Sequence, residues 1–552
     1  IVSVLLLLAR ILHPRIAPEQ TAIPLSVIAL EGFLTLVVMT AARVAVRLMH
    51  EHAERNERSA DDPRPLRALL VGAGRAGRMA ARELRQCPDA GYEPIGFLDD
   101  SPERQGQEIE HVRVLGTTAD APTIARSTQA DALILTMPSA SGTMVRGVVE
   151  RCRATGLPIQ TVPGLHELLR GTGDLTAIRP LSIDDLLGRA VFAVDELAQA
   201  RVRAAIAGKR VLVTGAGGSI GSELCRQLVA LDPERLVLVE SCENNLFEID
   251  AELRPKLGDR LASCLVDIRS PGEVAETFDA HRPHVVFHAA AFKHVPMMES
   301  HPGRAVHNNV YGTRVLIEAA RRVRCKRFVY VSTDKAVDPS SVMGATKRAA
   351  ELLVLAHDAE ADTDFLVVRF GNVLGSKGSV LHTFARQIEA GGPVTVTHPD
   401  VTRYFMTTTE AVRLVLQAAV VGKGGEVFLL DMGEPVKIVD LAQHMIDIAG
   451  PRARGVAIHF VGLRPGEKTH EALVSSREAA SPSGVPGLLA VHGETPPLAE
   501  VDPWVGELQR AVARRDDRAL LQLLARRTGY VPANHEGEAR DDAEVEGSTA
   551  AG

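Results

Sequence analysis

The sequence contains no pair of cysteines at the C-x-x-C spacing and no cluster of histidines at the spacing of metal ligands. The six cysteines lie far apart in the chain: Cys87, Cys152, Cys225, Cys242, Cys264 and Cys325. Scattered thiols of this kind are typical of a reduced, cytoplasmic protein and argue against a disulfide framework. We therefore expect no metal site.

The chain also lacks an excess of positive charge. Its 62 Lys and Arg against 69 Asp and Glu give a net charge of −7, so the composition does not indicate a nucleic-acid-binding protein. Charged residues make up 24% and hydrophobic residues 45%, ordinary values for a globular protein. At 552 residues the chain is too long for one domain and predicts roughly three to four.

An initiator methionine is missing, and the chain begins inside an apolar segment, Ile1–Ala9. We expect it to be a fragment with further membrane segments upstream. Ile23–Ala42 carries Glu31 as its only charge and has the length of roughly 20 residues that a helix needs to span a bilayer. Arginines follow directly, as is typical of the cytoplasmic side. The prediction is a multi-pass protein of the cell membrane, in contact with lipid over residues 1–49. A linker over 50–65 then leads to cytoplasmic domains. A buried helix of a soluble domain is the alternative.

The first segment after the linker has the order strand, glycine turn, helix. The apolar run Leu66–Val71 leads into G-A-G-R-A-G at residues 72–77, and Asp99 ends the next apolar run. This order is the dinucleotide-binding fingerprint, so we expect a Rossmann-like domain of the CoA-binding type over residues 66–190. The same glycines also serve a tight turn and close helix packing, so the sequence leaves open whether this domain binds a ligand.

A second glycine turn follows the apolar run Lys209–Val213. Gly215, Gly218 and Gly221 have the G-x-x-G-x-x-G spacing of extended short-chain dehydrogenases. They permit the turn, the approach of the backbone to a pyrophosphate, and close packing of helix on strand. Glu240 ends the next apolar run, where a carboxylate accepts hydrogen bonds from the adenosine ribose and repels a 2′-phosphate. NAD is therefore the expected cofactor, and NADP is less favoured.

Further apolar runs alternate with helical patterns up to residue 331. The predicted fold class is α/β, with two Rossmann-like, doubly wound parallel sheets in tandem after the remnant of a transmembrane helix. The second sheet is expected to belong to a catalytic domain over residues 206–475. An extension over 476–533, with one helix at Val501–Arg526, and a disordered acidic tail over 534–552 complete the prediction.

One stretch, residues 331–347, reads V-S-T-D-K-A-V-D-P-S-S-V-M-G-A-T-K. Thr333, Asp334 and Lys335 stand where a buried strand ends and a ligand crevice is expected to open. Met343 and Lys347 lie four residues apart and hence on one face of a helix. Extended short-chain dehydrogenases carry Y-x-x-x-K here, so the tyrosine is missing.

This stretch resembles the large membrane-associated nucleotide-sugar 4,6-dehydratases of bacterial polysaccharide synthesis, in which Thr-Asp-Lys occurs with a methionine in place of tyrosine. The resemblance is dense over residues 206–475. It implies a catalytic set: Thr333, Asp334, Lys335, Met343 and Lys347. In this set Lys335 removes the C5 proton and Asp334 protonates the departing C6 hydroxyl. Thr333 forms a hydrogen bond near O4, and Lys347 holds the nicotinamide ribose. A thioether cannot accept the proton of the C4 hydroxyl, so Asp334 or a water molecule is expected to accept it.

The resemblance also implies residues for two ligands. The NAD site comprises Gly215, Gly218, Ser219, Ile220, Gly221, Glu240, Asp267, Ile268, Ala289, Ala290 and Lys347. The site for a UDP-sugar comprises Lys293, Asn309, Asn372, Ser379, Val380, Arg403, Arg464 and Glu467. Arg403 and Arg464 suit a diphosphate because a guanidinium binds phosphate oxygens bidentately. Asn309 corresponds to a buried asparagine that braces the active-site helix.

The sequence therefore predicts an NAD-dependent 4,6-dehydratase that acts on UDP-N-acetylglucosamine and forms a homo-oligomer. Two alternatives stay open. One is a C4 or C5 epimerase of nucleotide sugars, and the other is a membrane-tethered sensor of NAD or nucleotide sugars that has lost catalysis.

Overall fold

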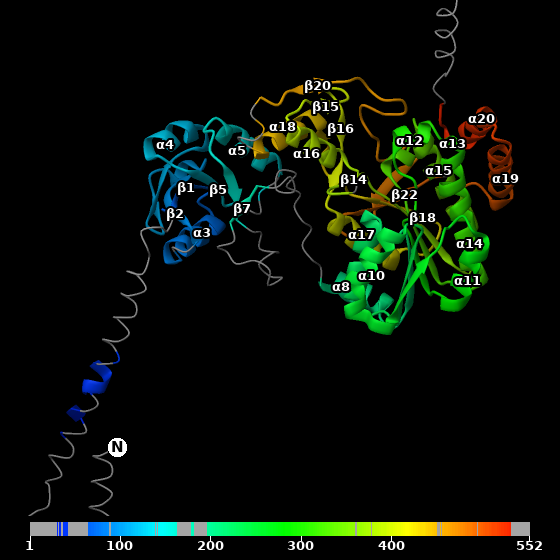
Figure 1. Ribbon diagram of the computed structural model, residues 1–552, viewed down its shortest axis with the longest axis horizontal. Helices are drawn as coiled ribbons and strands as arrows, with labels where there is room; N and C mark the ends of the chain where they lie inside the picture. The colour runs from blue at the N-terminus through cyan, green and yellow to red at the C-terminus, as the bar shows by residue number, and fades with distance from the viewer. Residues whose placement is uncertain are drawn as a thin grey trace, which may run out of the picture. The chain divides into compact units, whose positions relative to one another are not determined.

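The structure is a computed structural model, and it describes most of the chain between residues 64 and 531 (Figure 1). The described residues are 30, 33–34, 37–41, 43, 64–87, 90–137, 140, 142–162, 178–181, 196–358, 362–376, 378–449, 453, 455–493 and 495–531. Within these ranges, no helix is long and apolar enough to cross a membrane. The predicted membrane segments, the linker and the acidic tail lie largely or wholly outside the described residues, and they stay predictions.

The amino-terminal sheet is centred on a buried strand. Its strands are β1 (Leu66–Val71), β2 (Tyr92–Leu98), β3 (Glu108–Ile109), β4 (Val112–Gly116), β5 (Ala132–Leu135), β6 (Ile159–Thr161) and β7 (Arg179–Pro180). Its helices are α3 (Arg75–Gln86), α4 (Ala121–Thr128) and α5 (Gly142–Arg153). In the described part of the chain the strand order is β3-β4-β2-β1-β5-β6-β7, with parallel pairs β1/β5, β5/β6 and β2/β4. The predicted Rossmann-like parallel sheet is confirmed.

The second sheet is larger, and the catalytic stretch begins at the carboxyl end of one of its interior strands. Its strands are β8 (Arg210–Thr214), β9 (Arg235–Glu240), β10 (Leu261–Leu265), β11 (Val285–His288), β12 (Arg327–Val331), β13 (Asp364–Arg369), β18 (Glu426–Leu430), β21 (Ala479–Pro482) and β22 (Leu488–His492). The order is β10-β9-β8-β11-β12-β13-β18-β22-β21 over the described ranges, and every pair from β10 to β18 is parallel. The order reverses between β8 and β11, which is where ligands of doubly wound sheets bind.

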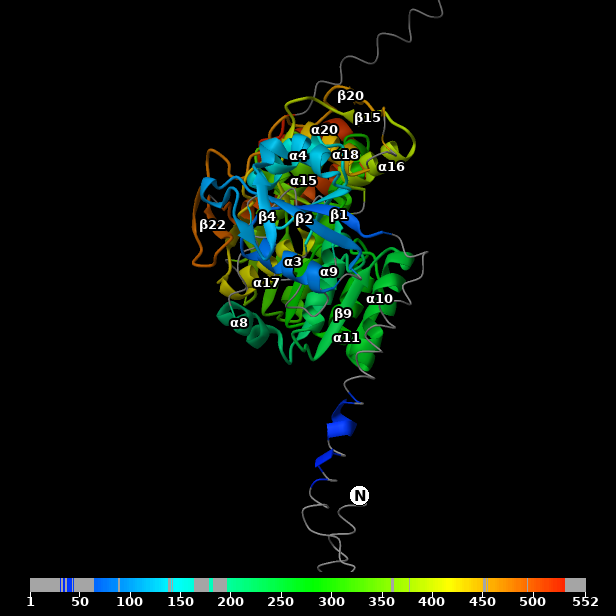
Figure 2. The same ribbon diagram turned by 90° about the vertical axis from the view of Figure 1, so that its left-hand side faces the viewer.

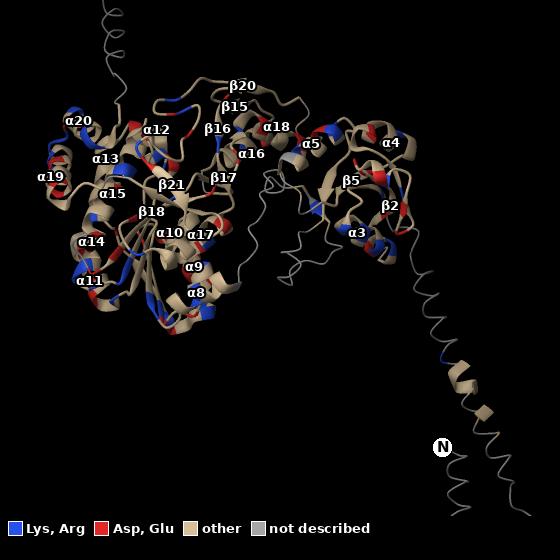
Figure 3. Cartoon of the chain, turned by 180° about the vertical axis from the view of Figure 1, so that it is seen from behind, with Lys and Arg blue, Asp and Glu red and all other residues tan. Residues whose placement is uncertain are grey.

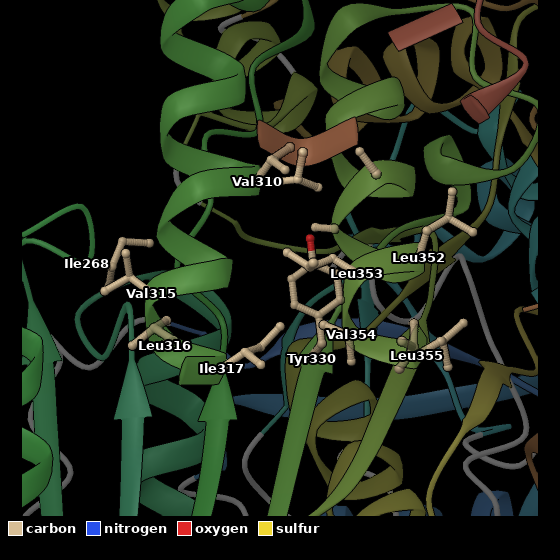
Figure 4. Close-up of a cluster of buried hydrophobic side chains, with 14 of the residues drawn as sticks. Ile268, Val310, Val315, Leu316, Ile317, Tyr330, Leu352, Leu353, Val354 and Leu355 are labelled. Atoms are coloured by element: carbon tan, nitrogen blue, oxygen red, sulfur yellow. The ribbon is translucent and has the colours of Figure 1, made fainter. Parts of the chain in front are cut away.

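Helices cover both faces of this sheet (Figures 1 and 2). One side holds α8 (Glu196–Ile206), α9 (Ser219–Val229), α10 (Glu243–Leu257) and α17 (Thr408–Val421). The other holds α11 (Pro271–His281), α12 (Val295–Glu299), α13 (Pro302–Val306), α14 (Gly312–Arg322) and α15 (Val342–Asp358). Successive strand residues point to opposite faces, so Val211 and Val213 pack in one core while Leu212 packs in the other. Figure 4 shows the second core, with Tyr330 among Ile317, Leu353 and Val354.

A smaller lobe follows the catalytic strands. It contains β14 (Asn372–Val373), β15 (Val394–Val396), β16 (Thr402–Arg403), β17 (Phe405–Met406), β19 (Val436–Lys437), β20 (Ile458–Phe460), α16 (Val380–Glu389) and α18 (Ile438–Ala449). Its strands pair two by two, as β14/β17, β15/β20 and β16/β19. Phe384, Val394 and Leu441 belong to its separate hydrophobic core. The residues predicted to bind substrate after position 371 therefore lie in or beside this lobe.

The carboxyl-terminal extension differs from the prediction. The hairpin β21/β22 adds two antiparallel strands to the catalytic sheet. The single helix predicted at Val501–Arg526 is wrong, because the chain forms α19 (Leu498–Arg514) and α20 (Asp517–Thr528). Arg515 adopts a left-handed φ of 56°, and the Asp516 carboxylate caps α20 by accepting a hydrogen bond from the Ala519 amide.

The two carboxyl-terminal helices are held together by their side chains. The indole of Trp504 donates to the Leu523 carbonyl at 2.8 Å. Both signs of charge gather over α19 and α20 (Figure 3), where Arg526 pairs with Glu507 and Arg527 with Glu500. The extension is therefore a folded part of the catalytic domain.

A buried network of charges lies beneath the catalytic stretch. Glu351 of α15 and Arg369 of β13 are both fully buried, with Arg369 Nη2 2.7 Å from Glu351 Oε2. The Ser332 hydroxyl donates to Glu351 at 2.6 Å, and Glu478 accepts from Arg369 at 2.8 Å. Burial alone would raise the pKa of Glu351, but the charge of Arg369 and the attached hydrogen bonds hold it down at about 2. The network thus ties α15, β13 and the extension to Ser332, the residue before Thr333.

Replacing Glu351 by Gln should lower the free energy of unfolding by about 3 to 5 kcal/mol, because the Arg369 guanidinium would stay buried without its charge partner on α15. Urea unfolding followed by the fluorescence of Trp504, the only tryptophan, measures this change. The matched control is Glu318→Gln, which removes an exposed i, i+4 pair with Arg314 and should cost less than about 1 kcal/mol. Equal effects of the two substitutions would contradict the structural importance of the network.

Candidate functional site

The second glycine turn forms a close-fitting cradle at the switch point of the sheet. Gly215 has a φ of +66°, and a Cβ there would lie 2.8 Å from the Ala290 backbone nitrogen. A Cβ at Gly221 would overlap the Gly215 carbonyl. α9 begins at Ser219 with neither a side-chain cap nor an acidic residue in its first turn. Glycine amides and an uncapped helix start fit the pyrophosphate of a dinucleotide.

Glu240 is fixed at the end of β9 by three backbone amides. Its Oε2 accepts from Gly217 at 3.1 Å, and its Oε1 accepts from Ser241 at 3.0 Å and from Cys242 at 3.1 Å. The carboxylate is thereby tied to the glycine turn, in the position expected for a ribose ligand. The residues present fit a nicotinamide dinucleotide.

The other predicted cofactor residues surround the same strand ends. Ala289 and Ala290 follow β11 and face Gly215. Asp267 pairs with Arg269, with 2.5 Å between Oδ2 and Nη2, and this hydrogen bond lowers the pKa of the Asp267 carboxyl. Ile268 is buried against Gly312, so its side chain belongs to the core and its backbone remains for ligand contact.

Thr333, Asp334 and Lys335 form a short turn directly after β12. The Thr333 hydroxyl donates to Asp334 Oδ1 at 2.9 Å, and Lys335 Nζ donates to the same oxygen at 3.0 Å. Lys335 Nζ also donates to Asn372 Oδ1 at 3.0 Å. Asp334 is completely buried, and its Oδ2 has no hydrogen-bond partner among the described residues. The turn therefore places a basic and an acidic group side by side and leaves one buried carboxylate oxygen without a hydrogen-bond partner in the described part of the chain.

A cavity of about 210 Å³ opens on this turn. Its lining includes five of the predicted residues: Lys335, Asn372, Arg403, Arg464 and Glu467. The remaining lining residues are Val295, Pro296, Ser340, Ser341, Gly466, Lys468 and Glu471. The structure thus brings the predicted base together with most of the predicted substrate residues from the smaller lobe.

Arg403 does not present the free guanidinium that the sequence predicted for a diphosphate. Its Nη1 donates to the carbonyl oxygens of Thr402 at 2.8 Å and Thr469 at 3.3 Å, and its Nη2 lies 3.2 Å from Glu467 Oε1. These contacts commit Arg403 to holding the loop that carries Glu467. Arg464 is exposed at the cavity and remains the candidate for an anionic group.

Three other predicted substrate residues are not in the cavity lining. Lys293 is exposed in the loop before α12, and Ser379 and Val380 form the start of α16. A Cβ at the neighbouring Gly378 would lie 2.7 Å from the His294 ring, so this loop packs against the segment that holds Lys293. Their proposed contacts with substrate stay predictions.

Asn309 is a bracing residue, as the resemblance implied, and its contact with substrate stays a prediction. It is buried in a π-helical turn, His307–Tyr311. Its Oδ1 accepts from the Phe292 amide at 2.8 Å, and its Nδ2 donates to the Phe292 carbonyl and to Thr346 Oγ1. The side-chain amide is thus occupied in joining the loop after β11 to helix α15.

Met343 and Lys347 lie on α15, and both are buried. Met343 belongs to the hydrophobic core, and its carbonyl accepts from Thr346. Lys347 Nζ donates to the Val331 carbonyl at 2.7 Å and lies 4.1 Å from the centre of the Tyr330 ring. Burial lowers the pKa of Lys347 to about 7, against the opposing charge of Glu351. Its proposed contact with the nicotinamide ribose stays a prediction.

Sequence reasoning missed Glu471, whose carboxylate lies in the cavity within 3.9 Å of three cations, Lys335, Arg403 and Lys468. It stands four residues after Glu467, just past the motif that drew attention to this loop. The loop is anchored to the catalytic stretch, because Ser340 donates to the Gly466 carbonyl and Lys468 to the Val337 carbonyl, both at 2.9 Å. Glu471 lies 136 positions after Lys335 in the sequence, so only their proximity in the folded chain identifies Glu471 as a site residue.

The amino-terminal sheet has its own cavity of about 510 Å³ at its first glycine turn. Asp99 Oδ2 accepts from the Ala73 amide at 2.7 Å and from Arg104 at 2.9 Å. Glu240 holds the second glycine turn in the same way. The two fingerprints thus form equivalent turns, and both carboxylates serve the internal structure of the turn.

Comparisons with known proteins agree over most of the chain. Residues 211–492 match a family model described as polysaccharide biosynthesis protein, and residues 26–163 match one described as CoA-binding domain. The capsular polysaccharide biosynthesis protein CapD of Staphylococcus aureus is 42% identical over 414 residues, 74% of this chain and 69% of that protein. The probable polysaccharide biosynthesis protein EpsC of Bacillus subtilis is 41% identical over 486 residues, 87% and 80% of the two chains. UDP-glucose 4-epimerase of Rickettsia canadensis is 35% identical over 280 residues, 49% of this chain and 79% of that protein.

The buried Lys347 should make stability depend on pH. Its pKa of about 7 in the folded chain lies below the ordinary lysine value of 10.5, so between these pH values the unfolded chain binds a proton that the native chain lacks. Stability should therefore rise from pH 7 to pH 9, by about 2 kcal/mol from this group alone. Urea unfolding of the wild type and of Lys347→Met at both pH values measures the contribution. Lys326→Met, which removes an exposed lysine, should keep the pH dependence of the wild type. An unchanged slope in Lys347→Met would refute the assignment.

Proposed function

The chain belongs to the polysaccharide biosynthesis protein family, and from this premise we propose that it is an NAD-dependent nucleotide-sugar 4,6-dehydratase. The proposed substrate is UDP-N-acetylglucosamine, and the product is a UDP-4-keto-6-deoxy sugar for surface polysaccharide. We further propose a cell-membrane location with the described domains on the cytoplasmic side, and a homo-oligomeric state.

One observation carries the proposed reaction. Lys335 lines the cavity and its Nζ lies 3.0 Å from Asp334 Oδ1, while Asp334 Oδ2 is buried without a hydrogen-bond partner in the part of the chain that the structure describes. Elimination of water from adjacent carbons needs a base at one carbon and an acid at the leaving group. A lysine amine in its neutral form and a neighbouring carboxyl group supply both, and one carboxyl oxygen has no hydrogen-bond partner within the described residues. This pair supports a dehydratase over an enzyme that only moves a hydride.

The chain's own residues divide the proton transfers. Lys335 Nζ, in its neutral form, takes the proton from C5, which a ketone at C4 makes acidic. Asp334 Oδ2 donates a proton to the C6 hydroxyl as it leaves, while Oδ1 stays bonded to Thr333 and Lys335. Lys335 then returns its proton to C5. Thr333, just after β12, holds the Asp334 carboxyl in place through a hydrogen bond. Thr333 therefore positions Asp334 in addition to its predicted hydrogen bond near O4.

A nicotinamide dinucleotide, when bound, supplies the oxidising and reducing equivalents at C4 and C6. The cradle at Gly215, Gly218 and Gly221 would hold its pyrophosphate. Glu240 would hold the adenosine ribose. Ser241 and Cys242 follow Glu240, so no cation directly after the carboxylate offers a site for a 2′-phosphate. This arrangement supports NAD over NADP.

An epimerase of nucleotide sugars is the second candidate. The likeness to UDP-glucose 4-epimerase favours it. Epimerisation at C4 also begins with oxidation at C4. An epimerase has no need for an acid at C6, so the unpartnered Asp334 oxygen would then have no chemical role. The two functions differ in the mass of the product.

Full-length protein incubated with NAD and UDP-N-acetylglucosamine in heavy water should give a product lighter than the substrate by one water and carrying deuterium at C5. Mass spectrometry and proton NMR measure both changes. Lys335→Ala should lower the rate of deuterium incorporation at C5 by a factor of about 10² to 10⁴, the usual contribution of a general base.

The matched control is Lys326→Ala, which removes an exposed lysine at the start of β12 and should leave the rate unchanged. A product of unchanged mass but altered configuration would establish the epimerase. Substrate left intact with every UDP-hexose would favour a sensor that has lost catalysis. Undiminished deuterium incorporation in Lys335→Ala would remove Lys335 from its role.

A further inference from the structure

Glu471 is a buried carboxylate without a hydrogen-bond donor at one of its oxygens. Its side chain is 4% exposed and lies in the wall of the cavity. Its Oε1 is 3.9 Å from Lys335 Nζ and from Arg403 Nε, and its Oε2 is 3.9 Å from Lys468 Nζ. All three distances exceed the length of a hydrogen bond, about 2.7 to 3.2 Å. Within the described ranges, Oε2 has no hydrogen-bond partner.

Such an arrangement fits the binding of a ligand hydroxyl group. Three cations compensate the charge of the buried carboxylate, but none of them lies within hydrogen-bond distance of its oxygens. A buried polar atom without a partner needs an explanation, and a ligand hydroxyl that donates to Glu471 Oε2 provides one. The hydroxyl oxygen could in turn accept from one of the surrounding ammonium groups. The site therefore has the polarity of a sugar-binding position.

The other cavity residues cannot take up a proton at this place. Glu467 is already bonded at both oxygens: Oε1 accepts from Thr397 and Arg403, and Oε2 accepts from the Arg464 amide. Guanidinium and amide groups do not accept protons near neutral pH. Lys335 is assigned to C5, and Lys468 Nζ is bonded to the Val337 carbonyl. Glu471 is thus the lining group with both a free oxygen and the chemistry of a base.

Outside the cavity, neither candidate on the cofactor side offers a base. Met343 has a thioether in the hydrophobic core. Tyr330, the tyrosine nearest Lys347, lies in the same core, and burial raises the pKa of its hydroxyl well above the usual value. Lys347 itself donates to the Val331 carbonyl. None of these side chains of α15 and β12 can therefore accept the proton that a tyrosine at position 343 would accept.

We propose that Glu471 is a catalytic residue that binds the 4-hydroxyl of the sugar and accepts its proton as C4 is oxidised. This inference rests on the proposed function, because it assigns the proton acceptor of the first step. The O4–H bond breaks toward Glu471 Oε2 and the C4 carbonyl forms; a bound nicotinamide dinucleotide would be the oxidant that takes the hydrogen of C4 with its two electrons. The proton held by Glu471 balances the one that Asp334 gives to the departing C6 hydroxyl, with Lys335 lying between the two carboxyl groups.

Binding measurements test the contact without turnover. Full-length protein with NADH, which cannot oxidise C4, is titrated by calorimetry with UDP-N-acetylglucosamine and with its 4-deoxy analogue. The wild type should bind the analogue about 10-fold more weakly, the effect of one hydrogen bond to a charged group. Glu471→Met should bind both ligands within about 2-fold of each other, because the partner of the 4-hydroxyl is gone. Equal discrimination by wild type and Glu471→Met would overturn the contact.

Kinetics test the proton transfer. Glu471→Gln keeps a hydrogen-bond acceptor but cannot take a proton. Its affinity for the UDP-sugar should stay within about 3-fold of the wild type, while formation of reduced nicotinamide in a single turnover should slow by about 10² to 10⁴. Glu471→Asp should recover part of the rate, whereas a purely structural role predicts no such recovery. The exposed Glu276→Gln on α11 is the matched control and should behave as the wild type.

The outcomes separate this inference from the proposed function. Dehydration by the wild type with an undiminished rate in Glu471→Gln would overturn the inference and leave the dehydratase in place. Epimerisation without dehydration, with slow C4 oxidation in Glu471→Gln, would overturn the dehydratase and support Glu471. Failure of the wild type to bind any UDP-hexose would overturn both.

Discussion

The buried ion pair between Glu351 and Arg369 is the constraint on which the position of the catalytic turn after β12 depends. Two fully buried charges are tolerated only when each is paired and hydrogen-bonded, so their positions are fixed closely. Glu351 fixes α15, the helix of Met343 and Lys347, against β13. Through Ser332 it also fixes the residue before the Thr333 turn. Because Glu478 completes the pair, the carboxyl-terminal hairpin becomes part of the same support.

The same charges set the electrostatics of Lys347. The ammonium loses hydration by burial, and only Glu351, one helical turn away, favours its charged form. Glu351 is already neutralised by Arg369 and bonded to Arg348, so its help is limited. The pKa of Lys347 therefore lies near 7, and a bound anionic cofactor would favour its charged form. The Glu351 network thus holds α15, β13 and the carboxyl-terminal extension together.

Local patterns in the sequence were sufficient for the framework. The strands from β8 to β13 are short apolar runs, and the glycine spacing of 215, 218 and 221 requires a particular turn, so both could be predicted from neighbouring residues. Contacts between distant residues could not. Arg403 looked like a phosphate ligand until the structure showed it bonded to Glu467 and Thr469, and Asn309 proved to be fully used by Phe292 and Thr346. The break between α19 and α20 escaped prediction because the hydrophobic period runs through Arg515, whose left-handed backbone interrupts the helix.

The methionine at position 343 acquires a physical meaning from these contacts. In a site with tyrosine, the group that accepts a proton from the substrate lies on the same helix as the lysine, one turn away. Here that helical position is filled by an apolar side chain that strengthens the core. The unpartnered carboxyl oxygens of the described residues around Lys335 lie instead on Asp334 and Glu471, in two different loops, and the other oxygen of each carboxylate lies within 3.9 Å of Lys335 Nζ. Acid–base chemistry in this chain is therefore concentrated around the lysine of the turn, and α15 serves to position that turn and the cofactor site.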